Sequence, residues 1–260
     1  ALGLSFFLLS LIASPALAEL TLESVYPNQG VLGKDLPVTL NGTGFDENTR
    51  VSMTLDVGNK KAIIGSVDTQ GVAWDVTVVG DTAYLAAGNS GLQVIDISNP
   101  VSPQVIGSVD TPGNAYRGVI SGSRAYVADG LSGLQVIDIS SSEAPQIIGS
   151  LDTAGAALDV VVDGLYAYIA DDTGDLLVVD ISNEISPQSS AVLEMTGRAV
   201  GVTVIEDTVY VTGNDGDHLI VDVQDPKVPV ILDTVKFNCT TSSAEFIYLK
   251  GVIATDDNVY

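Results

Sequence analysis

The sequence runs for 260 residues and carries 33 Asp or Glu against 10 Lys or Arg, a formal net charge of −23, while 46% of its residues are hydrophobic. Because the acids are spread between apolar, β-rich segments, an acidic disordered tail is excluded and a globular protein is favoured. The charge makes nucleic acid and anionic membrane surfaces poor partners, and it leaves cations, basic proteins and carbohydrate open. The single cysteine, Cys239, excludes an intrachain disulfide among these residues.

The first 18 residues have the features of a secretory signal peptide. An apolar run over residues 2–12 is followed by Ala16-Leu17-Ala18, a small-x-small pattern that signal peptidase cleaves. The run is too short to span a bilayer as a helix. We therefore predict a signal peptide over residues 1–18, a secreted protein and no transmembrane segment after cleavage. A buried N-terminal strand or helix is the alternative.

Two short segments after the predicted cleavage site carry a second pattern. Residues 24–30 read Ser-Val-Tyr-Pro-Asn-Gln-Gly, and residues 38–45 read Val-Thr-Leu-Asn-Gly-Thr-Gly-Phe. They resemble the start of an IPT/TIG immunoglobulin-like domain, a kind of domain found in extracellular receptors and adhesion proteins. We expect a partial IPT/TIG-like segment with short Ig-like strands over residues 19–58, because too few residues are left there for a complete sandwich.

The chain then follows a repeat of 42 residues that no insertion interrupts over four copies. A period of about 40–45 residues rich in β-formers is typical of β-propellers with four-stranded blades. We expect an all-β fold with a propeller over residues 59–260. Its four full blades are expected at about 65–106, 107–148, 149–190 and 191–235, with partial blades at both ends, the last at 236–260. Because residue 260 falls in mid-blade, we expect the natural protein to continue.

Within one repeat, four β-rich segments alternate with turn residues. Strands are predicted around residues 73–79, 82–87, 92–97 and 104–109, separated by Gly, Asn, Asp and Pro. Such a meander cannot cover both of its faces alone. Stacking each sheet between neighbours explains why the strands are apolar almost throughout and do not alternate strictly.

The most regular words of the repeat point to a known family. Gly-Leu-Gln-Val-Ile-Asp-Ile-Ser occurs at 91–98 and again at 133–140, and Ala-Tyr-Val-Ala-Asp occurs at 125–129. Over about residues 65–235 the chain closely resembles the LVIVD repeat family of bacterial and archaeal surface proteins. The resemblance implies a surface-associated β-propeller, and hence a secreted, periplasmic or cell-surface location. It supplies no catalytic residues.

A set of loop acids forms the predicted ligand-binding face. In propellers the connections between blades and the loops between second and third strands lie at the same end of the strands, where ligands usually bind. The acids expected there are the four spaced 42 apart in the connections and one in a second-to-third loop: Asp68, Asp110, Asp152, Glu194 and Asp129. The alternative is that Asp is simply a residue that turns favour.

Acids that break the repeat symmetry are the candidates for a metal site. In the third and fourth copies the second-to-third loops are richer in carboxylates than in the first two copies. Clustered carboxylate oxygens suit Ca²⁺, which takes six to eight oxygen ligands. The candidate ligands are Asp171, Asp172, Asp175, Asp215 and Asp217. No complete calcium loop of the Asp-x-Asp-x-Asp-Gly type with its closing Glu is present.

Two sets of repeated residues are predicted to be structural. A carboxylate inside an apolar strand is costly unless it is paired, so we expect one aspartate of each copy to bind backbone amides and fix the blade. The tyrosines are expected to pack between blades, with a sugar-stacking platform as the alternative. These residues are Asp96, Asp138, Asp180, Asp222, Tyr84, Tyr126, Tyr168 and Tyr210.

Enzyme signatures are scarce, and no catalytic residue is assigned. His218 is the only histidine, so a Ser-His-Asp or Cys-His arrangement would have to use it, and it is expected in a turn. We expect a non-catalytic scaffold that binds protein or carbohydrate, in adhesion or a related role, through the loop face. The alternative is a propeller-type hydrolase or lyase that acts on extracellular carbohydrate with Ca²⁺ or a pair of carboxylates. A third reading is a spacer between other domains.

Overall fold

The structure, a computed structural model, describes residues 7–12, 38–41, 50–56, 61–214, 217–236, 254–255 and 258–259. Side chains are described for residues 63–214 and 218–235. These residues form strands and turns, and none of the segments described is a helix long and apolar enough to cross a membrane.

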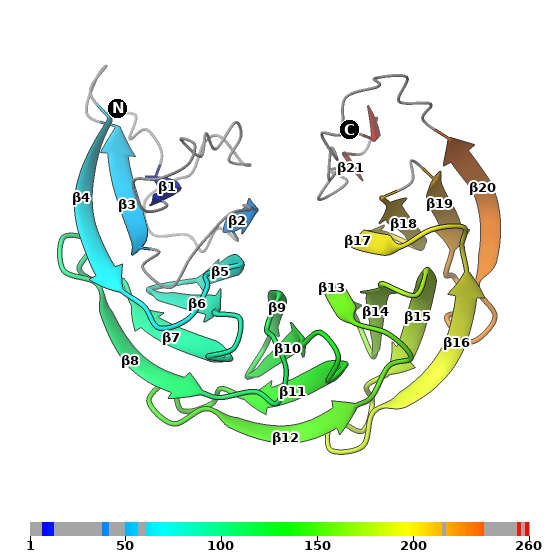
Figure 1. The fold of residues 1–260 in the computed structure, drawn as a ribbon, viewed down its shortest axis with the longest axis horizontal. Helices are drawn as coiled ribbons and strands as arrows, with labels where there is room; N and C mark the ends of the chain where they lie inside the picture. The colour runs from blue at the N-terminus through cyan, green and yellow to red at the C-terminus, as the bar shows by residue number, and fades with distance from the viewer. Residues whose placement is uncertain are drawn as a thin grey trace. The chain divides into compact units, whose positions relative to one another are not determined.

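Each of the four repeats folds into a four-stranded antiparallel sheet, called here blade 1 to blade 4 (Figure 1). Blade 1 contains β5 (Asp75–Val79), β6 (Thr82–Ala86), β7 (Leu92–Asp96) and β8 (Gln104–Val109). Blade 2 contains β9 (Arg117–Ser121), β10 (Arg124–Ala128), β11 (Leu134–Asp138) and β12 (Gln146–Leu151). Blade 3 contains β13 (Ala157–Asp163), β14 (Tyr166–Asp171), β15 (Asp175–Asp180) and β16 (Gln188–Glu194). Blade 4 contains β17 (Ala199–Ile205), β18 (Thr208–Gly213), β19 (Asp217–Asp222) and β20 (Val230–Lys236).

Strands outside the four blades extend the same architecture. β1 (Phe7–Ile12), β3 (Arg50–Asp56) and β4 (Lys61–Asp68) form a three-stranded sheet, and β2 (Val38–Asn41) adds to blade 1 by pairing with β5. β21 (Ala254–Thr255) and β22 (Asn258–Val259) pair with each other. β1 falls within the predicted signal peptide. Of the predicted Ig-like segment, β2 and β3 pair with propeller strands, and its other residues lie outside the described part of the chain.

The fourth strand of a blade carries a repeated irregularity. In blade 1 Val94 pairs with Gly107, but the next residue, Ile95, pairs with Val105. The same shift occurs between β15 and β16 and between β19 and β20. A bulge of this kind bends the strand and increases its twist, so that it can follow the neighbouring blade.

A glycine in the fourth strand makes room for the next blade. A Cβ atom added at Gly107 would overlap the carbonyl oxygen of Ser142, in the connection between β11 and β12, and would lie 3.1 Å from Glu143 Cα. Gly65 meets Pro100 in the same way, and Gly149 meets Glu184. The backbone of one blade therefore packs directly on a loop of the next, and glycine is the residue that allows this approach.

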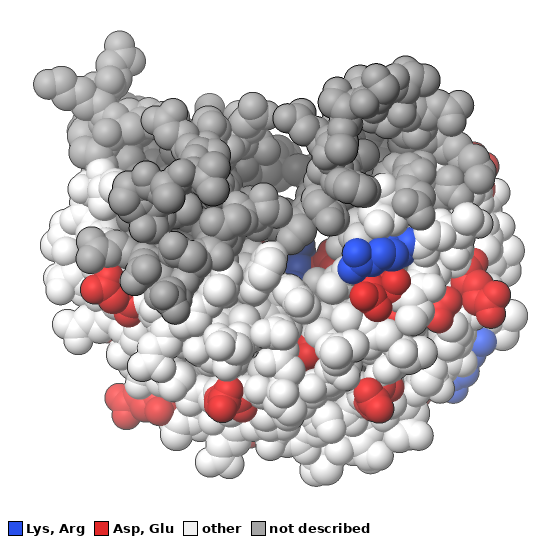
Figure 2. Space-filling model, in the orientation of Figure 1, with Lys and Arg blue, Asp and Glu red and all other residues white. Residues whose placement is uncertain are grey.

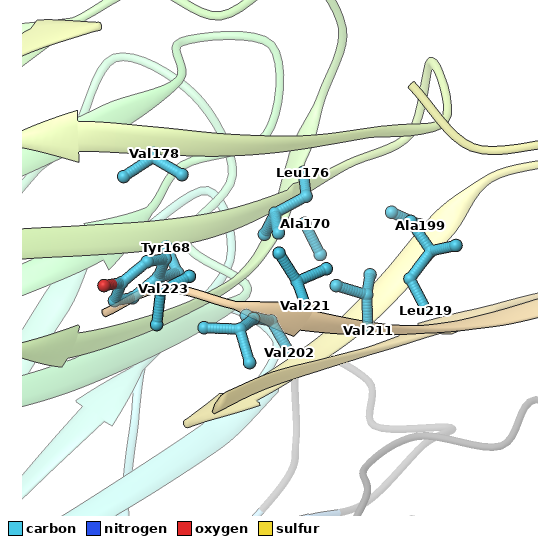
Figure 3. Close-up of a cluster of buried hydrophobic side chains, with 11 residues drawn as sticks. Tyr168, Ala170, Leu176, Val178, Ala199, Val202, Val211, Leu219, Val221 and Val223 are labelled. Atoms are coloured by element: carbon cyan, nitrogen blue, oxygen red, sulfur yellow. The ribbon is translucent and has the colours of Figure 1, made fainter. Parts of the chain in front are cut away.

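The chain divides into two compact units, residues 1–125 with 138–146, and residues 126–137 with 147–260. The core of the first unit includes Ala73, Val76 and Leu85, all at most 1% exposed. In the second unit, side chains of blades 3 and 4 meet in one cluster, which includes Tyr168 and Leu176 of blade 3 and Val223 of blade 4 (Figure 3). The facing surfaces of blades 3 and 4 are thus apolar because each covers the other.

Candidate functional site

A polar pocket lies at the end of blade 1 where the connections between blades meet the turn between β6 and β7. Its volume is about 360 Å³. It brings together two of the four acids predicted in the inter-blade connections, Asp68 and Asp110, which are both exposed. We call it the blade-1 pocket. Its lining residues are Asp68, Gln70, Asn89, Ser90, Gln93, Val105, Ser108 and Asp110.

One wall of the pocket is the segment that enters blade 1, residues 68–71. Gly71 adopts a φ of 77°, which favours glycine, and a Cβ there would overlap the carbonyl oxygen of Ala87. The buried side chain of Gln93 makes two hydrogen bonds to the backbone of this segment. Its Nε2 donates to the carbonyl of Gln70 at 2.6 Å, and its Oε1 accepts from the Gln70 amide at 3.4 Å. Asp68 is thereby carried on a segment fixed at two points.

The opposite wall is the segment that leaves blade 1, residues 109–111. It packs on Gly91, where an added Cβ would overlap the carbonyl oxygen of Val109 and lie 2.6 Å from the Thr111 amide. Gly91 has a φ of 65°. Thr111 is buried at 5% exposure, so the chain is anchored next to the exposed Asp110.

The floor between these walls is a tight turn over residues 87–91. The amide of Ala87 donates to the carbonyl of Gly91 at 2.8 Å, and the amide of Ser90 donates to the carbonyl of Ala87 at 3.1 Å. Gly88 exchanges two backbone hydrogen bonds with Ala115, in the connection to blade 2. The turn that presents Asn89 is therefore held by its own blade and by the next connection.

The chemistry of the pocket is that of an acceptor-rich, negatively charged site. The lining provides two carboxylates, three carboxamides, two hydroxyl groups and one apolar side chain, Val105, and it contains no Lys, Arg or His. Acidic side chains are also spread over the described part of the face shown in Figure 2. Such a site favours a ligand that donates hydrogen bonds and carries positive charge or many hydroxyl groups.

The other acids predicted on the ligand-binding face are placed differently. Asp152 is exposed in the connection between blades 2 and 3, and Glu194 is exposed at the end of β16. Asp129 is 0% exposed, so it does not present its carboxylate on the surface as expected. It follows β10, and its amide donates to the carbonyl of Gly133 at 2.8 Å, while the adjacent Gly130 bridges to Ala157 of the next blade. Asp129 is therefore buried beside the point where its own turn meets the next connection.

Asp171, a predicted calcium ligand, is buried and already bound by donors of the chain. Its Oδ2 accepts from the amide of Gly155 at 3.1 Å. Its Oδ1 accepts from the amide of Thr173 at 3.0 Å and from the Thr173 hydroxyl at 2.6 Å. The carboxylate thus ties the turn of blade 3 to the segment that enters the blade.

Asp172 and Asp175 are also engaged at the same turn. Asp172 Oδ1 accepts from the amide of Ala156 at 2.8 Å, and its Oδ2 lies 3.4 Å from Nη2 of Arg198. Asp175 Oδ2 lies 3.3 Å from the Thr173 hydroxyl.

The structure describes only part of the predicted calcium ligands. Among the side chains that the structure describes, no group of three His, Cys, Asp or Glu is placed to hold a metal ion, so Asp171, Asp172 and Asp175 do not form such a group. Asp215 and the side chain of Asp217 lie outside the described residues. A site that includes them stays a prediction.

The repeated aspartates lie at the ends of their strands and are half-buried, which corrects the expectation of a carboxylate inside an apolar strand. Each accepts a hydrogen bond of 2.8–2.9 Å from the amide two residues on: Asp96 from Ser98, Asp138 from Ser140, Asp180 from Ser182 and Asp222 from Gln224. These are local turns that stop the third strand. Bonds from Ser98 and Ser182 lower the pKa values of Asp96 and Asp180, and the Ser140 amide lowers the pKa of Asp138.

The repeated tyrosines lie in the second strand of each blade. Tyr84, Tyr126 and Tyr168 are buried at 8%, 3% and 1% exposure, and Tyr210 is half-buried. Burial raises the pKa of Tyr168 to about 12, because the ionised phenol would lose its hydration. Side chains so deeply covered are in no position to stack on a sugar.

A set of charged residues in the first strands was missed by the sequence reasoning. Asp75, Arg117 and Asp159 occupy the same place in copies one to three. Arg117 Nε lies 3.9 Å from Asp75 Oδ2, so the pair joins blade 1 to blade 2. Asp159 Oδ2 accepts from the amide of Val202 at 2.8 Å and joins blade 3 to blade 4. Aligning every polar position on the 42-residue period would have found them.

Two further residues lie where sequence reasoning did not place them. His218 is in β19 opposite Thr212 and is only 9% exposed, so it is not a turn residue. Trp74, the only tryptophan, packs edge-on against Tyr116 with ring centroids 5.0 Å apart. The two aromatic residues are one repeat apart, so they form another contact between consecutive copies.

Comparison with known proteins places these repeats. The model of the LVIVD repeat matches residues 70–111, 112–153, 154–191 and 196–241. No protein with a curated description matches the sequence.

Solved structures with 10–13% identity share the fold. A functionally unknown protein from Desulfotomaculum acetoxidans is 13% identical with a TM-score of 0.61, over 73% of this chain and 63% of that one. The computationally designed protein Ika8 is 12% identical with a TM-score of 0.63, over 87% and 64%. The β-propeller domain of Cps50 (Swd1) from Myceliophteria thermophila is 10% identical with a TM-score of 0.56, over 78% and 69%. The chain thus spans less than two thirds of the first two structures. With the four sheets, these likenesses confirm the predicted β-propeller.

Proposed function

Because the chain belongs to the LVIVD repeat family, we propose that it is a non-catalytic binding module that acts in secreted form or at the cell surface, through the loop face of its propeller. Protein and carbohydrate are the two partner classes, and adhesion is the biological role that such binding would serve. The observation that carries the proposal is the blade-1 pocket, where two exposed carboxylates and three carboxamides converge on one cavity.

The arrangement of the pocket suits recognition. Its walls are fixed by Gly71 and Gly91, which allow close backbone contacts, and by the hydrogen bonds from the Gln93 side chain to Gln70. A site built in advance loses little entropy when it binds, which favours affinity for a small group.

The rival proposal of a hydrolase or lyase needs a carboxyl group that is kept protonated by an apolar environment. Asp68 and Asp110 line one cavity, as a catalytic pair would, but both are exposed and share it with polar side chains. This polar environment favours the binding proposal over the enzyme proposal.

The proposal is tested by immobilising the 260-residue chain and probing it with arrays of glycans and of peptides. We expect saturable binding that is lost in the double variant Asp68→Asn/Asp110→Asn. The matched control is Asp81→Asn/Asp163→Asn, which removes the same two charges from exposed hairpins between first and second strands. Release of reducing sugar or unsaturated product from an extracellular polysaccharide, lost in the same double variant, would instead establish the hydrolase or lyase.

A further inference from the structure

The polar lining of the blade-1 pocket is not a requirement of the repeat. Positions 70 and 89 of the first copy correspond to Pro112 and Leu131 in the second. Blade 2 nevertheless builds the same wall: a Cβ added at Gly133 would overlap the carbonyl oxygen of Leu151 and lie 2.8 Å from the Thr153 amide. The fold therefore tolerates apolar residues there, and Gln70 and Asn89 are in excess of what the turn needs.

The corresponding turn of blade 2 shows what the repeat looks like without this polar lining. Leu131 is 80% exposed, so an apolar side chain stands in solvent where blade 1 has an amide. The two carboxylates recur as Asp or Glu in the second and third copies, and the fourth copy has Glu194 with Lys236, but only in blade 1 do carboxamides at 70, 89 and 93 accompany them. The first copy thus differs from the second in the chemistry of this turn and not in its backbone.

The charge and the size of the pocket select its occupant. Two carboxylates and the carboxamide oxygens provide acceptors for a cation with several N–H donors, and no basic residue of the lining competes. The volume of about 360 Å³ is near the lower end of ligand pockets, which suits one side chain better than an oligosaccharide. Val105, 39% exposed, offers an apolar surface for an aliphatic stem.

We infer that the blade-1 pocket receives the cationic side chain, Lys or Arg, of a partner protein. The inference rests on the proposed function and names the partner chemistry of the same site. The head group of the partner side chain lies between Asp68 and Asp110, its stem lies on Val105, and the carboxamides of Gln70 and Asn89 accept from its remaining donors. The excess of 33 acids over 10 basic residues in the chain increases the rate at which a basic partner reaches the site.

The test is a nuclear magnetic resonance titration of the full chain, because the side-chain amide signals of Gln70, Asn89 and Gln93 report on the pocket directly. The probes are the N-acetyl methylamides of arginine, lysine and norleucine, methyl β-glucoside and CaCl₂. Norleucine has the aliphatic stem of lysine without its charge. We expect the arginine or lysine probe to shift these signals saturably, and norleucine to leave them in place.

Two variants and one change of conditions complete the test. The variant Asp68→Asn/Asp110→Asn should lower the affinity for the basic probe at least about fivefold. The control Asp81→Asn/Asp163→Asn should change this affinity by less than about twofold. Raising the salt concentration should weaken binding to the unaltered chain.

The outcomes that overturn the inference are distinct from failure of the proposed function. Shifts of the pocket signals by methyl β-glucoside or CaCl₂, with none from the basic probes, would overturn the cationic partner and keep a binding loop face. Equal weakening in both double variants would reduce the effect to the general charge of the chain. No shift with any probe would overturn the pocket as a site for these groups, while array binding that survives Asp68→Asn/Asp110→Asn would place recognition elsewhere on the chain.

Discussion

Replacing Gly107 with Ala tests whether consecutive blades interlock through their backbones. The added methyl group would overlap the carbonyl oxygen of Ser142 and lie 3.1 Å from both Glu143 Cα and the Glu143 carbonyl carbon. Both neighbours are backbone, so neither can rotate away as a side chain would. No positive φ is involved at Gly107, and the cost is therefore steric.

The expected magnitude follows from overpacking a rigid interface. Insertion of a methylene-sized group into packed structure lowers the free energy of unfolding by about 1–3 kcal/mol. Because the contacts here are with backbone, we expect a loss of about 3 kcal/mol. For a domain of this size the melting temperature should fall by about 6–12 °C. The measurement is urea and thermal unfolding followed by circular dichroism.

The matched control lies two repeats further along, at Ala191, which occupies the position of Gly107 in the third copy. Ala191→Gly should cost about 0.5–1 kcal/mol, the ordinary effect of glycine in a strand. If Gly107→Ala changes the free energy of unfolding by less than about 0.5 kcal/mol, the blades are not interlocked at this point and the reasoning fails.

Three further predictions concern the carboxylates. Asp171→Ala should destabilise the chain by about 1–3 kcal/mol, because it leaves the amides of Gly155 and Thr173 without their acceptor, whereas Asp175→Ala should have a small effect; equal unfolding midpoints in urea would contradict this. Lowered pKa values at Asp96, Asp138 and Asp180 stabilise the fold above their ordinary value of 3.8, so this contribution should be lost as the pH falls through the lowered values; a melting temperature that is flat from pH 5 to pH 2 would argue against it. Millimolar Ca²⁺ should leave the melting temperature unchanged, since the described carboxylates of the blade-3 turn are already bound to donors of the chain; a rise reversed by chelator would establish a calcium site that includes Asp215 or Asp217.

The repeat made the fold predictable, because a constant period forces the same contacts in every copy. Strands expected at 92–97 and 104–109 are observed as β7 and β8 within one residue at each end. Consecutive blades pack closely where a glycine such as Gly107 contacts Ser142. In the sequence, the only sign of this packing is a glycine that recurs with the repeat. The reason for this glycine is the close approach of the next blade's backbone, which the sequence alone does not show.

Burial of individual acids was the part that sequence reasoning could not supply. Asp129 and Asp68 both belong to loops at the same end of the strands, yet Asp129 is buried and Asp68 is exposed. Which loop acid is buried depends on tertiary packing that the spacing of the acids in the sequence does not show. Likewise, Asp138 was expected inside a strand because apolar residues precede it, but the turn that it forms with Ser140 ends the strand there.

The candidate site was predicted in part. The spacing of 42 identified Asp68 and Asp110, whereas attention to repeated residues passed over Gln70 and Asn89, which do not recur. In a repeat protein, the fold accounts for what every copy shares. Residues found in one copy alone are therefore the better guide to a binding site.

The most direct test of the central claim is isothermal titration of a ligand found on the arrays into the unaltered chain and the two double variants. The account predicts that Asp68→Asn/Asp110→Asn weakens binding by about tenfold, while the charge-matched Asp81→Asn/Asp163→Asn stays within about twofold. Equal affinity for all three proteins, or equal loss in both variants, would contradict the claim that the loop face of blade 1 is where this propeller binds its partner.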